Sequence, residues 1–194
     1  MRAVLIIVDM LNDFFERSPV LANERARLVA RTNLLARGFR SAGLPVFWIR
    51  QEFAPDLHDA FPEMRAKKVS ITIAGTTGCE LLSELDCLPI DSVIVKKRYS
   101  VFFGTDLDAR LLNLRPDFLV VAGVNTHACV RMTAVDAYQR DHEVIVAADC
   151  VASNDPEHHD VTLRYIDGKI GRVLPAAEIL NLIEALPNPA LQRT

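Results

Sequence analysis

Short apolar runs that recur along the chain constrain its fold more than any other feature of the sequence. Each run is four to six residues long, nearly continuous in apolar residues and rich in Val and Ile. This composition is typical of strands that are buried on both faces of a parallel sheet. The runs lie at residues 3–8, 44–49, 92–95, 118–123 and 143–148, and a further short strand is predicted at 171–173.

Helical patterns fill the intervals between these runs. The longest pattern is amphipathic and closes at Gly43. Because strand and helix alternate throughout, the sequence predicts an α/β fold: a doubly wound, Rossmann-like, mostly parallel sheet of about six strands flanked by helices. The predicted helices cover residues 22–42, 77–86, 106–114, 128–140, 157–167 and 175–186.

The length of 194 residues fits a single domain, which we expect to span residues 1–186. Hydrophobic residues make up 50% of the chain, which is enough for a core without disulfides or a structural metal. Residues 51–76 form the longest irregular segment, and a loop of that length usually covers a functional site. This segment is also a candidate for contact between subunits. Residues 187–194 are interpreted as an untethered C-terminal tail.

Charge and hydropathy exclude several classes of function. The formal net charge is −3 and the sequence pI is about 5.9, so the chain lacks the basic face of a nucleic-acid-binding protein. No segment reaches the roughly 18 apolar residues of a membrane helix. The N-terminal apolar run is interrupted at Asp9, too early for a signal peptide. We therefore expect a cytoplasmic protein that binds neither nucleic acid nor membrane.

Neither the cysteines nor the histidines follow a disulfide or metal-site pattern. The four cysteines form no C-x-x-C pair, and without a secretion signal a disulfide framework is not expected. The five histidines show no H-x-x-x-H spacing. Asp56 and His58 could begin a two-ligand metal site, but the next histidine is far along the chain, so a surface loop is the favoured interpretation. We expect no metal and no cofactor.

Polar side chains follow several predicted strands at the point where each strand ends. Ligands of open α/β sheets bind at the carboxyl ends of the strands. Asp9 follows the first strand, Lys96 follows "SVIV", and Cys129 follows the strand at 118–123. An acid, a lysine and a cysteine at one sheet edge suit nucleophilic catalysis, in which a thiol needs a base and a nearby positive charge.

Each of these residues also has an ordinary structural interpretation. Asp9 could cap a helix or loop, Lys96 could be solvated, and Cys129 could be a small core residue. Their coincidence at one edge favours the catalytic interpretation. A nucleotide-binding Rossmann domain is disfavoured, because it would show G-x-G-x-x-G after the first strand, where this chain has "DMLNDFF".

Four stretches in order make the chain similar to a known family. They are "IIVDMLNDFF" at 6–15, "VKKRYSVFFGTDLDARL" at 95–111, "VAGVNTHACVRMTAVDAYQRDHEVIVAADCVAS" at 121–153 and "EHHDVTLRYI" at 157–166. On these motifs the chain resembles the isochorismatase-like cysteine hydrolase superfamily over essentially its whole length. The resemblance implies the isochorismatase-like hydrolase fold.

The resemblance also implies a catalytic triad of Asp9, Lys96 and Cys129. Lys96 is preferred because the family lysine commonly precedes the Tyr-Ser of this motif by three residues, and Lys97 is the alternative. The family has a cis peptide in the segment that corresponds to Val124-Asn125. The backbone N–H groups of Asn125 and Cys129 would then form an oxyanion hole. Lys96 and the helix that begins near Cys129 are expected to lower the pKa of the thiol.

The implied activity is hydrolysis of an amide-like C–N bond of a small molecule through a thioester. Two alternatives stay open: isochorismatase-type cleavage of a vinyl ether by Asp9, and a catalytically silent oligomer that only binds a ligand. The nicotinamidase branch holds a metal with an Asp and several His, of which this chain offers only Asp56 and His58. Position alone makes six residues candidates for the substrate pocket: Asn12, Phe14, Gln51, Glu52, Tyr99 and Phe102. Related folds commonly form a homodimer or homotetramer, and we expect the same here.

Overall fold

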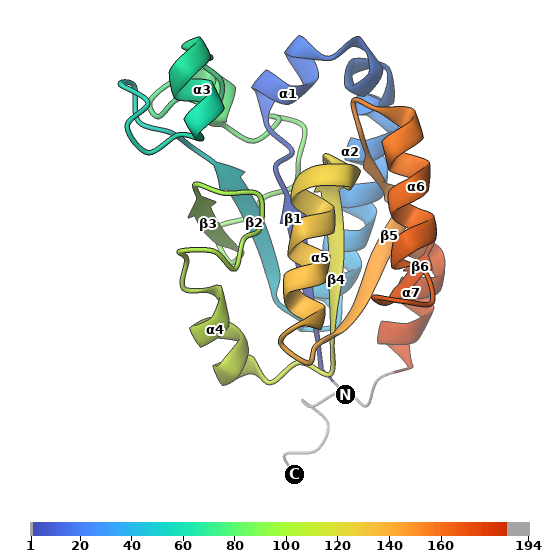
Figure 1. The fold of residues 1–194 in the computed structure, drawn as a ribbon. Coiled ribbons are helices and arrows are strands. Elements are labelled where there is room, and N and C mark those ends of the chain that lie inside the picture. The colour runs from blue at the N-terminus through green and yellow to red at the C-terminus, as the bar shows by residue number, and fades with distance from the viewer. Residues whose placement is uncertain (1, 186–194) are drawn as a thin grey trace.

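The computed structural model describes residues 2–185, which form one parallel sheet between two layers of helices (Figure 1). The sheet has six strands in the order β3-β2-β1-β4-β5-β6. The prediction of a doubly wound α/β fold with about six strands is therefore confirmed. The strands are β1 (Ala3–Val8), β2 (Val46–Gln51), β3 (Ser92–Lys96), β4 (Phe118–Val124), β5 (Glu143–Ala152) and β6 (Arg172–Leu174).

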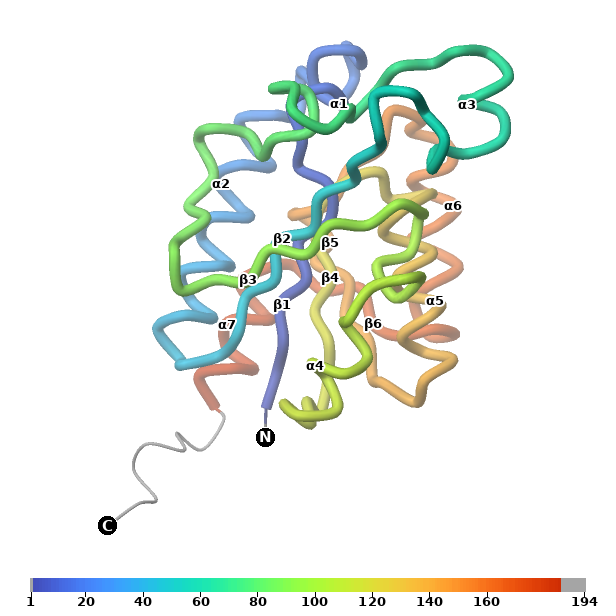
Figure 2. The backbone as a smooth tube through the Cα atoms, turned by 90° about the vertical axis from the view of Figure 1, so that its left-hand side faces the viewer, coloured from blue at the N-terminus to red at the C-terminus, as the bar shows by residue number. Residues whose placement is uncertain are grey.

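Helices cover both faces of this sheet. Figure 2 shows α2 and α7 on one side of the strands and α5 and α6 on the other. The helices are α1 (Asn12–Arg17), α2 (Pro19–Ser41), α3 (Pro62–Lys67), α4 (Leu107–Leu114), α5 (Arg131–Tyr138), α6 (Pro156–Ile166) and α7 (Ala176–Glu184). Two short turns complete the set: the 3₁₀ turn η1 (Thr77–Cys79) and the π turn η2 (Thr126–Val130).

The central strand β1 explains why this sequence needs two helix layers. All six of its residues are buried. Leu5 and Ile7 pack in the core beside α2 and α7, whereas Ile6 and Val8 pack in the core beside α4 and α5. Each such aliphatic side chain contributes about 1.5–3 kcal/mol when it leaves water. A strand that is apolar on both faces gains this energy only between two apolar layers.

The long helix α2 follows from its cap and its apolar stripe. The Ser18 hydroxyl accepts a hydrogen bond from the Leu21 N–H at 3.2 Å, and Pro19 occupies the first helical turn. Leu28 and Phe39 belong to the buried stripe that faces the sheet. The helix ends just before Gly43, whose φ of +69° is a conformation that glycine adopts without strain.

The helix predicted at residues 77–86 is wrong. Only Thr77–Cys79 form a short 3₁₀ turn, and the chain then runs beside α1. Glu80 accepts a hydrogen bond from the Asn12 N–H at 3.1 Å, and the Leu82 N–H donates to the Met10 carbonyl at 2.9 Å. These tertiary bonds replace the bonds of a helix. The sequence analysis also missed α1, which has only six residues and no clear period.

Residues 51–76 are irregular apart from α3, as the sequence predicted. In Figure 1 this segment stands beyond the carboxyl end of β2. Within residues 2–185, no helix is long and apolar enough to cross a membrane. The predicted tail at 187–194 and the last residue of the helix predicted at 175–186 lie outside the described residues.

Candidate active site

The central strands β1 and β4 bring the candidate site to the point where the strand order reverses. The chain leaves β1 toward β2 on one side, and β4 lies on the other side of β1. In folds of this kind, ligands bind at this switch point, outside the carboxyl ends of the strands. Asp9 directly follows β1, and the turn η2 with Cys129 directly follows β4.

Asp9 is fully buried and held in an uncommon backbone conformation. Its φ is +52°, in the left-handed region that costs a non-glycine residue energy. The Asp9 N–H donates to the Ile49 carbonyl at 3.0 Å, which ties the residue to the end of β2. On the other side β4 approaches so closely that a Cβ at Gly123 would lie 1.9 Å from the Val8 carbonyl oxygen. Glycine at position 123 therefore allows β1 and β4 to meet beside Asp9.

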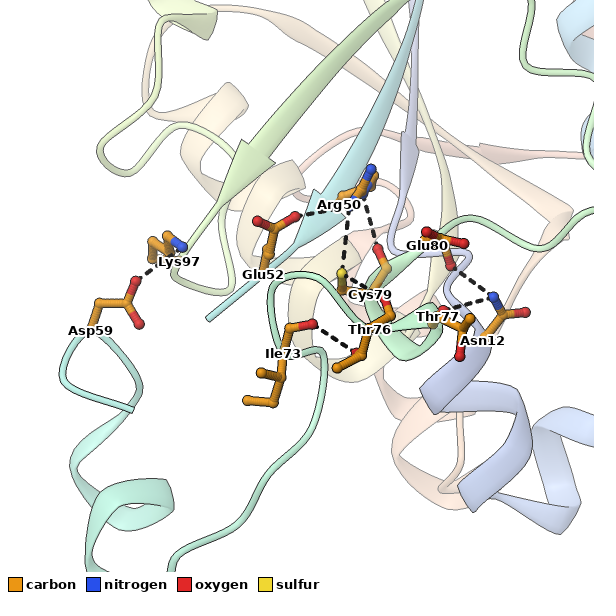
Figure 3. Close-up of polar contacts among 10 residues, drawn as sticks. All are labelled: Asn12, Arg50, Glu52, Asp59, Ile73, Thr76, Thr77, Cys79, Glu80 and Lys97. Atoms are coloured by element: carbon orange, nitrogen blue, oxygen red, sulfur yellow. Dashed lines mark hydrogen bonds and ion pairs between the residues drawn. The ribbon is translucent and has the colours of Figure 1, made fainter. Parts of the chain in front are cut away.

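Lys96 reaches the same point from the edge strand β3. Its side chain is fully buried, and its ammonium lies 2.7 Å from Asp9 Oδ2. The same nitrogen donates to the Arg98 carbonyl at 3.0 Å and approaches Cys129 Sγ at 3.5 Å. All three N–H donors of the lysine thus have a partner. Lys97 lies elsewhere: it pairs with Asp59 at 3.0 Å on the surface (Figure 3), which favours Lys96 as the site lysine.

Cys129 sits in the π turn η2, which is held by the His159 side chain of α6 and by the backbone of Asn154 in the loop before α6. Single π turns occur often at functional sites. The His159 ring nitrogen Nδ1 lies 2.9 Å from the Thr126 hydroxyl. The Asn154 N–H donates to the Asn125 side-chain oxygen at 2.9 Å. The peptide Val124-Asn125 is cis, as the resemblance implied.

The three side chains form a buried group with one cation and two acids. Burial raises the pKa of Asp9, and the Lys96 ammonium only partly opposes this. Burial also raises the pKa of the Cys129 thiol, with Lys96 opposing and Asp9 reinforcing the shift. Burial disfavours the charge of Lys96 as well, but its attraction to Asp9 and Cys129 outweighs this and raises its pKa. The expectation of a lowered thiol pKa is therefore wrong.

A shared proton follows from these charges. One ammonium compensates one negative charge, so Asp9 and Cys129 together retain one proton. That proton can sit on sulfur beside a carboxylate, or on the carboxyl beside a thiolate. In both arrangements the buried group is neutral overall. Transfer between them needs no net change of buried charge, which is what an acid–base pair in a dry site requires.

Cys129 opens onto a cavity of about 430 Å³. Three of the pocket residues expected from position line it: Phe14, Gln51 and Tyr99. Asn125, of the proposed oxyanion hole, lines it too. The remaining lining residues are Phe61, Glu63, Met64, Lys67, Val69, Ile71, His127, Ala128 and Asn154.

The other three pocket candidates do not line this cavity. The Asn12 side-chain amide donates to the Thr77 carbonyl at 2.9 Å and so holds η1 beside α1 (Figure 3). Glu52 pairs with Arg50 at 2.8 Å (Figure 3). Phe102 is buried in the core beside α4 and α5, where the Arg140 guanidinium lies 4.6 Å from its ring.

The sequence analysis expected residues 51–76 to cover a site but named none of the residues that α3 and its neighbours contribute to the cavity wall. The available signal was the set of apolar residues spread through this irregular segment. Phe61 illustrates how this wall is held: its ring lies 4.7 Å from Tyr99 and 5.9 Å from Phe53. The Arg98 guanidinium lies 5.1 Å from the same ring. Such ring contacts fix a loop segment over the cavity.

The candidate metal ligands do not belong to this cavity. Asp56 and His58 are both exposed and pair with each other at 2.6 Å. Within residues 2–185, no group of three or more His, Cys, Asp or Glu side chains could hold a metal ion.

Known proteins similar to this chain share its fold over nearly its whole length. The family model described as Isochorismatase domain matches residues 3–178. The phenazine biosynthesis protein PhzD1 of Pseudomonas aeruginosa is 32% identical over 186 residues, covering 92% of this chain and 85% of that protein. A cysteine hydrolase from Pseudomonas syringae pv. phaseolicola superposes with a TM-score of 0.86 at 26% identity, covering 95% and 93% of the two chains. The N-carbamoylsarcosine amidase of Thermoplasma acidophilum gives a TM-score of 0.76 at 32% identity, covering 91% and 97%.

Proposed function

Because the chain belongs to the isochorismatase family and is a hydrolase, we propose that it cleaves an amide-like C–N bond of a small molecule through a thioester on Cys129. Asp9, Lys96 and Cys129 are its proposed catalytic triad. One observation carries the proposal: the Lys96 ammonium lies 2.7 Å from Asp9 and 3.5 Å from the sulfur of Cys129, which lines the cavity. A base, a cation and a thiol in contact are the parts that nucleophilic catalysis needs.

The first half of the reaction forms the thioester. Asp9 takes the thiol proton while Lys96 compensates the charge that moves to sulfur. The thiolate attacks the amide carbonyl, and the oxygen becomes negative within reach of the Asn125 and Cys129 N–H groups. When the C–N bond breaks, Asp9 returns its proton to the leaving nitrogen, so an amine or ammonia departs.

The second half regenerates the free enzyme. Water enters from the cavity, and Asp9, now a carboxylate, takes its proton as the hydroxyl attacks the thioester. The C–S bond breaks, and the thiolate recovers a proton from Asp9 as the carboxylic acid product leaves. Gln51 supports both halves, because its backbone opposes the rise that burial causes in the pKa of Asp9.

Replacing the sulfur tests this proposal. In Cys129→Ala, hydrolysis of an amide that the wild type cleaves should fall by at least about 10³-fold, because no thioester can form. Cys150→Ala is the matched control, since Cys150 is also buried but lies within β5 and packs in the core beside α2 and α7. Circular dichroism and thermal unfolding establish that both variants fold. Amide hydrolysis that survives in Cys129→Ala would exclude the thioester route.

A second candidate function rests on the raised pKa of Asp9. A buried carboxyl whose pKa is raised is the kind of group that acts as a general acid, which is what vinyl-ether cleavage of isochorismate requires. That reaction would not need sulfur. Pyruvate release from isochorismate, measured with the wild type and with Cys129→Ala, separates the two functions: only the ether-cleaving route predicts equal rates in both.

A further inference from the structure

We infer that the cavity above Cys129 selects an uncharged amide substrate with an apolar body, and that it excludes substrates bearing a carboxylate. The inference rests on the proposed function, because it names the substrate class of the same site. It is drawn from three features of the cavity: an apolar wall, a wall of neutral hydrogen-bonding groups, and charges that are already compensated.

The apolar wall comes from α1 and from the segment around α3. Phe14, Phe61 and Met64 line the cavity, together with Val69 and Ile71. Ring and thioether surfaces of this kind pack well against a flat or aliphatic group, and they form neither hydrogen bonds nor ion pairs with a charged group. A carboxylate pressed against them would lose hydration without a hydrogen bond in return.

The cavity is also lined by neutral polar groups. Gln51 is 4% exposed, and its side-chain nitrogen Nε2 is buried without a hydrogen-bond partner among the described residues. An unpaired buried donor is costly, so it favours a ligand that brings an acceptor. Asn125 and Asn154 add further neutral amide or backbone groups to this lining. A carbonyl or ring nitrogen of an uncharged substrate would satisfy Gln51.

His127 lines the cavity too, and its surroundings favour the neutral ring. Ser153 Oγ accepts a hydrogen bond from the Asp155 N–H at 3.2 Å, so its own proton is free to point to His127 Nδ1. That assignment places the ring proton on Nε2. Burial lowers the pKa of His127, and the neighbouring His158 adds to this, although Asp155 opposes it. His158 lies 5.7 Å away from ring to ring.

The formal charges at the cavity cancel. Among the described residues that line it, Lys67 is the only lysine or arginine and Glu63 the only acid. These two side chains pair at 2.7 Å on the exposed face of α3. Below the cavity Lys96 is compensated by Asp9. Arg98, under Phe61, donates to the carbonyls of Asp59 and Lys97. Among the described residues that line the cavity, an incoming carboxylate would therefore meet no cation without an acidic partner.

Alkylation of Cys129 by two reagents of different charge tests this inference. Iodoacetamide is neutral and iodoacetate is an anion, yet both lose iodide to the same thiolate. The ratio of their rates at Cys129 therefore cancels the ionisation of the thiol and reports the cavity alone. The reference is the same ratio for 2-mercaptoethanol in the same buffer. The expected result at pH 7 is an iodoacetate-to-iodoacetamide ratio at Cys129 about tenfold below the reference, which corresponds to about 1.4 kcal/mol.

Variants of the α3 pair sharpen the measurement. Glu63→Gln leaves Lys67 uncompensated and should raise the ratio, whereas Lys67→Gln should lower it. Asp106→Asn breaks a similar exposed pair, Asp106 with Arg110 on α4, and should leave the ratio unchanged. If the rate ratio changed equally in all three variants, the Glu63–Lys67 pair would not control how the cavity discriminates between the neutral and the anionic reagent.

Substrate preference gives a second readout. Benzamide and 4-carbamoylbenzoate differ by one carboxylate, and the neutral amide is expected to have the lower KM. A ratio at or above the reference, or preferred turnover of the anionic amide, would overturn the inference and leave the thioester proposal intact. If Cys129→Ala hydrolysed these amides at the wild-type rate, the proposed function would fail, and the inference would fail with it.

Discussion

At the scale of single residues, the Lys96 ammonium serves two acidic groups at once. It lies within 2.7 Å of Asp9 and 3.5 Å of the Cys129 sulfur, and it compensates one negative charge. Either Asp9 or Cys129 can therefore be ionised, but ionising both would leave one buried negative charge uncompensated, which costs free energy. This competition predicts how substitution of each partner changes the thiol.

Alkylation of Cys129 by iodoacetamide should rise with pH later than that of an ordinary thiol, because burial raises the pKa of the sulfur. A raised pKa means that the thiolate forms only at higher pH. Rates measured between pH 6 and 11, with 2-mercaptoethanol as the reference, test this. A midpoint below that of the reference would show that Lys96 and the helix dominate burial.

Two variants should move that midpoint in opposite directions. Asp9→Asn removes an acid whose charge raises the thiol pKa, so alkylation should begin at lower pH while amide hydrolysis is lost. Lys96→Met removes the compensating cation, so alkylation should begin at higher pH. Lys96→Met also leaves Asp9 buried without its partner and should cost about 3–5 kcal/mol of stability. Shifts of the same sign in both variants would contradict a shared proton.

The sequence predicted where these three residues meet, because the carboxyl ends of parallel strands share one edge of the sheet. It could not predict where neighbouring side chains turn. Glu52 lies one residue beyond β2 and was expected in the pocket, but its carboxylate forms an ion pair with Arg50 at 2.8 Å. The sequence analysis preferred Lys96 over Lys97 because of its place in the family motif, and no physical argument distinguished the two lysines. Only the structure shows one buried and the other paired with Asp59.

At the scale of elements, β1 and β4 bring their backbones unusually close beside Asp9. Gly123 has a φ of +107°, and a Cβ there would lie 1.9 Å from the Val8 carbonyl oxygen. Two separate costs, backbone conformation and crowding, therefore fall on one position. The same close contact places the end of β1 beside the turn η2.

Gly123→Ala should accordingly destabilise the protein more than a glycine substitution that lacks crowding. Gly43→Ala is the control, because its φ is +69° and no atom would lie within 4 Å of the added Cβ. The control should lose about 1–2 kcal/mol in denaturant unfolding. Gly123→Ala should lose clearly more and should slow alkylation of Cys129. Equal losses would show that β1 and β4 can separate without cost.

The accuracy of the sequence-based elements followed the length and burial of each element. Strands buried on both faces were predicted to within a few residues. Their continuous apolar runs are unfavourable when exposed to water, so each run has to be buried inside the sheet. The predicted helix at 77–86 failed because hydrogen bonds to Asn12 and Met10 hold that segment against α1. Those bonds join residues about 70 positions apart, and no local pattern reports them.

At the scale of the whole molecule, the doubly wound sheet determines where the site lies, and an irregular segment forms part of the cavity wall. Strand order places Asp9 and Cys129 at the switch point. Residues 51–76 then supply Phe61 and Met64 to the cavity wall. The first part follows from apolar periodicity and was predictable. The second depends on loop geometry, which is set by tertiary ring contacts such as Phe61 with Tyr99.

The central claim is that Cys129 forms an acyl-enzyme from a small amide. The most direct measurement is intact-protein and peptide mass spectrometry after acid quenching of the enzyme during turnover of an amide panel. The account predicts one acyl group of the substrate on Cys129, and no adduct in Asp9→Asn, in which no group returns a proton to the leaving nitrogen. Steady amide turnover without any acyl group on Cys129, and with undiminished rate in Cys129→Ala, would contradict it.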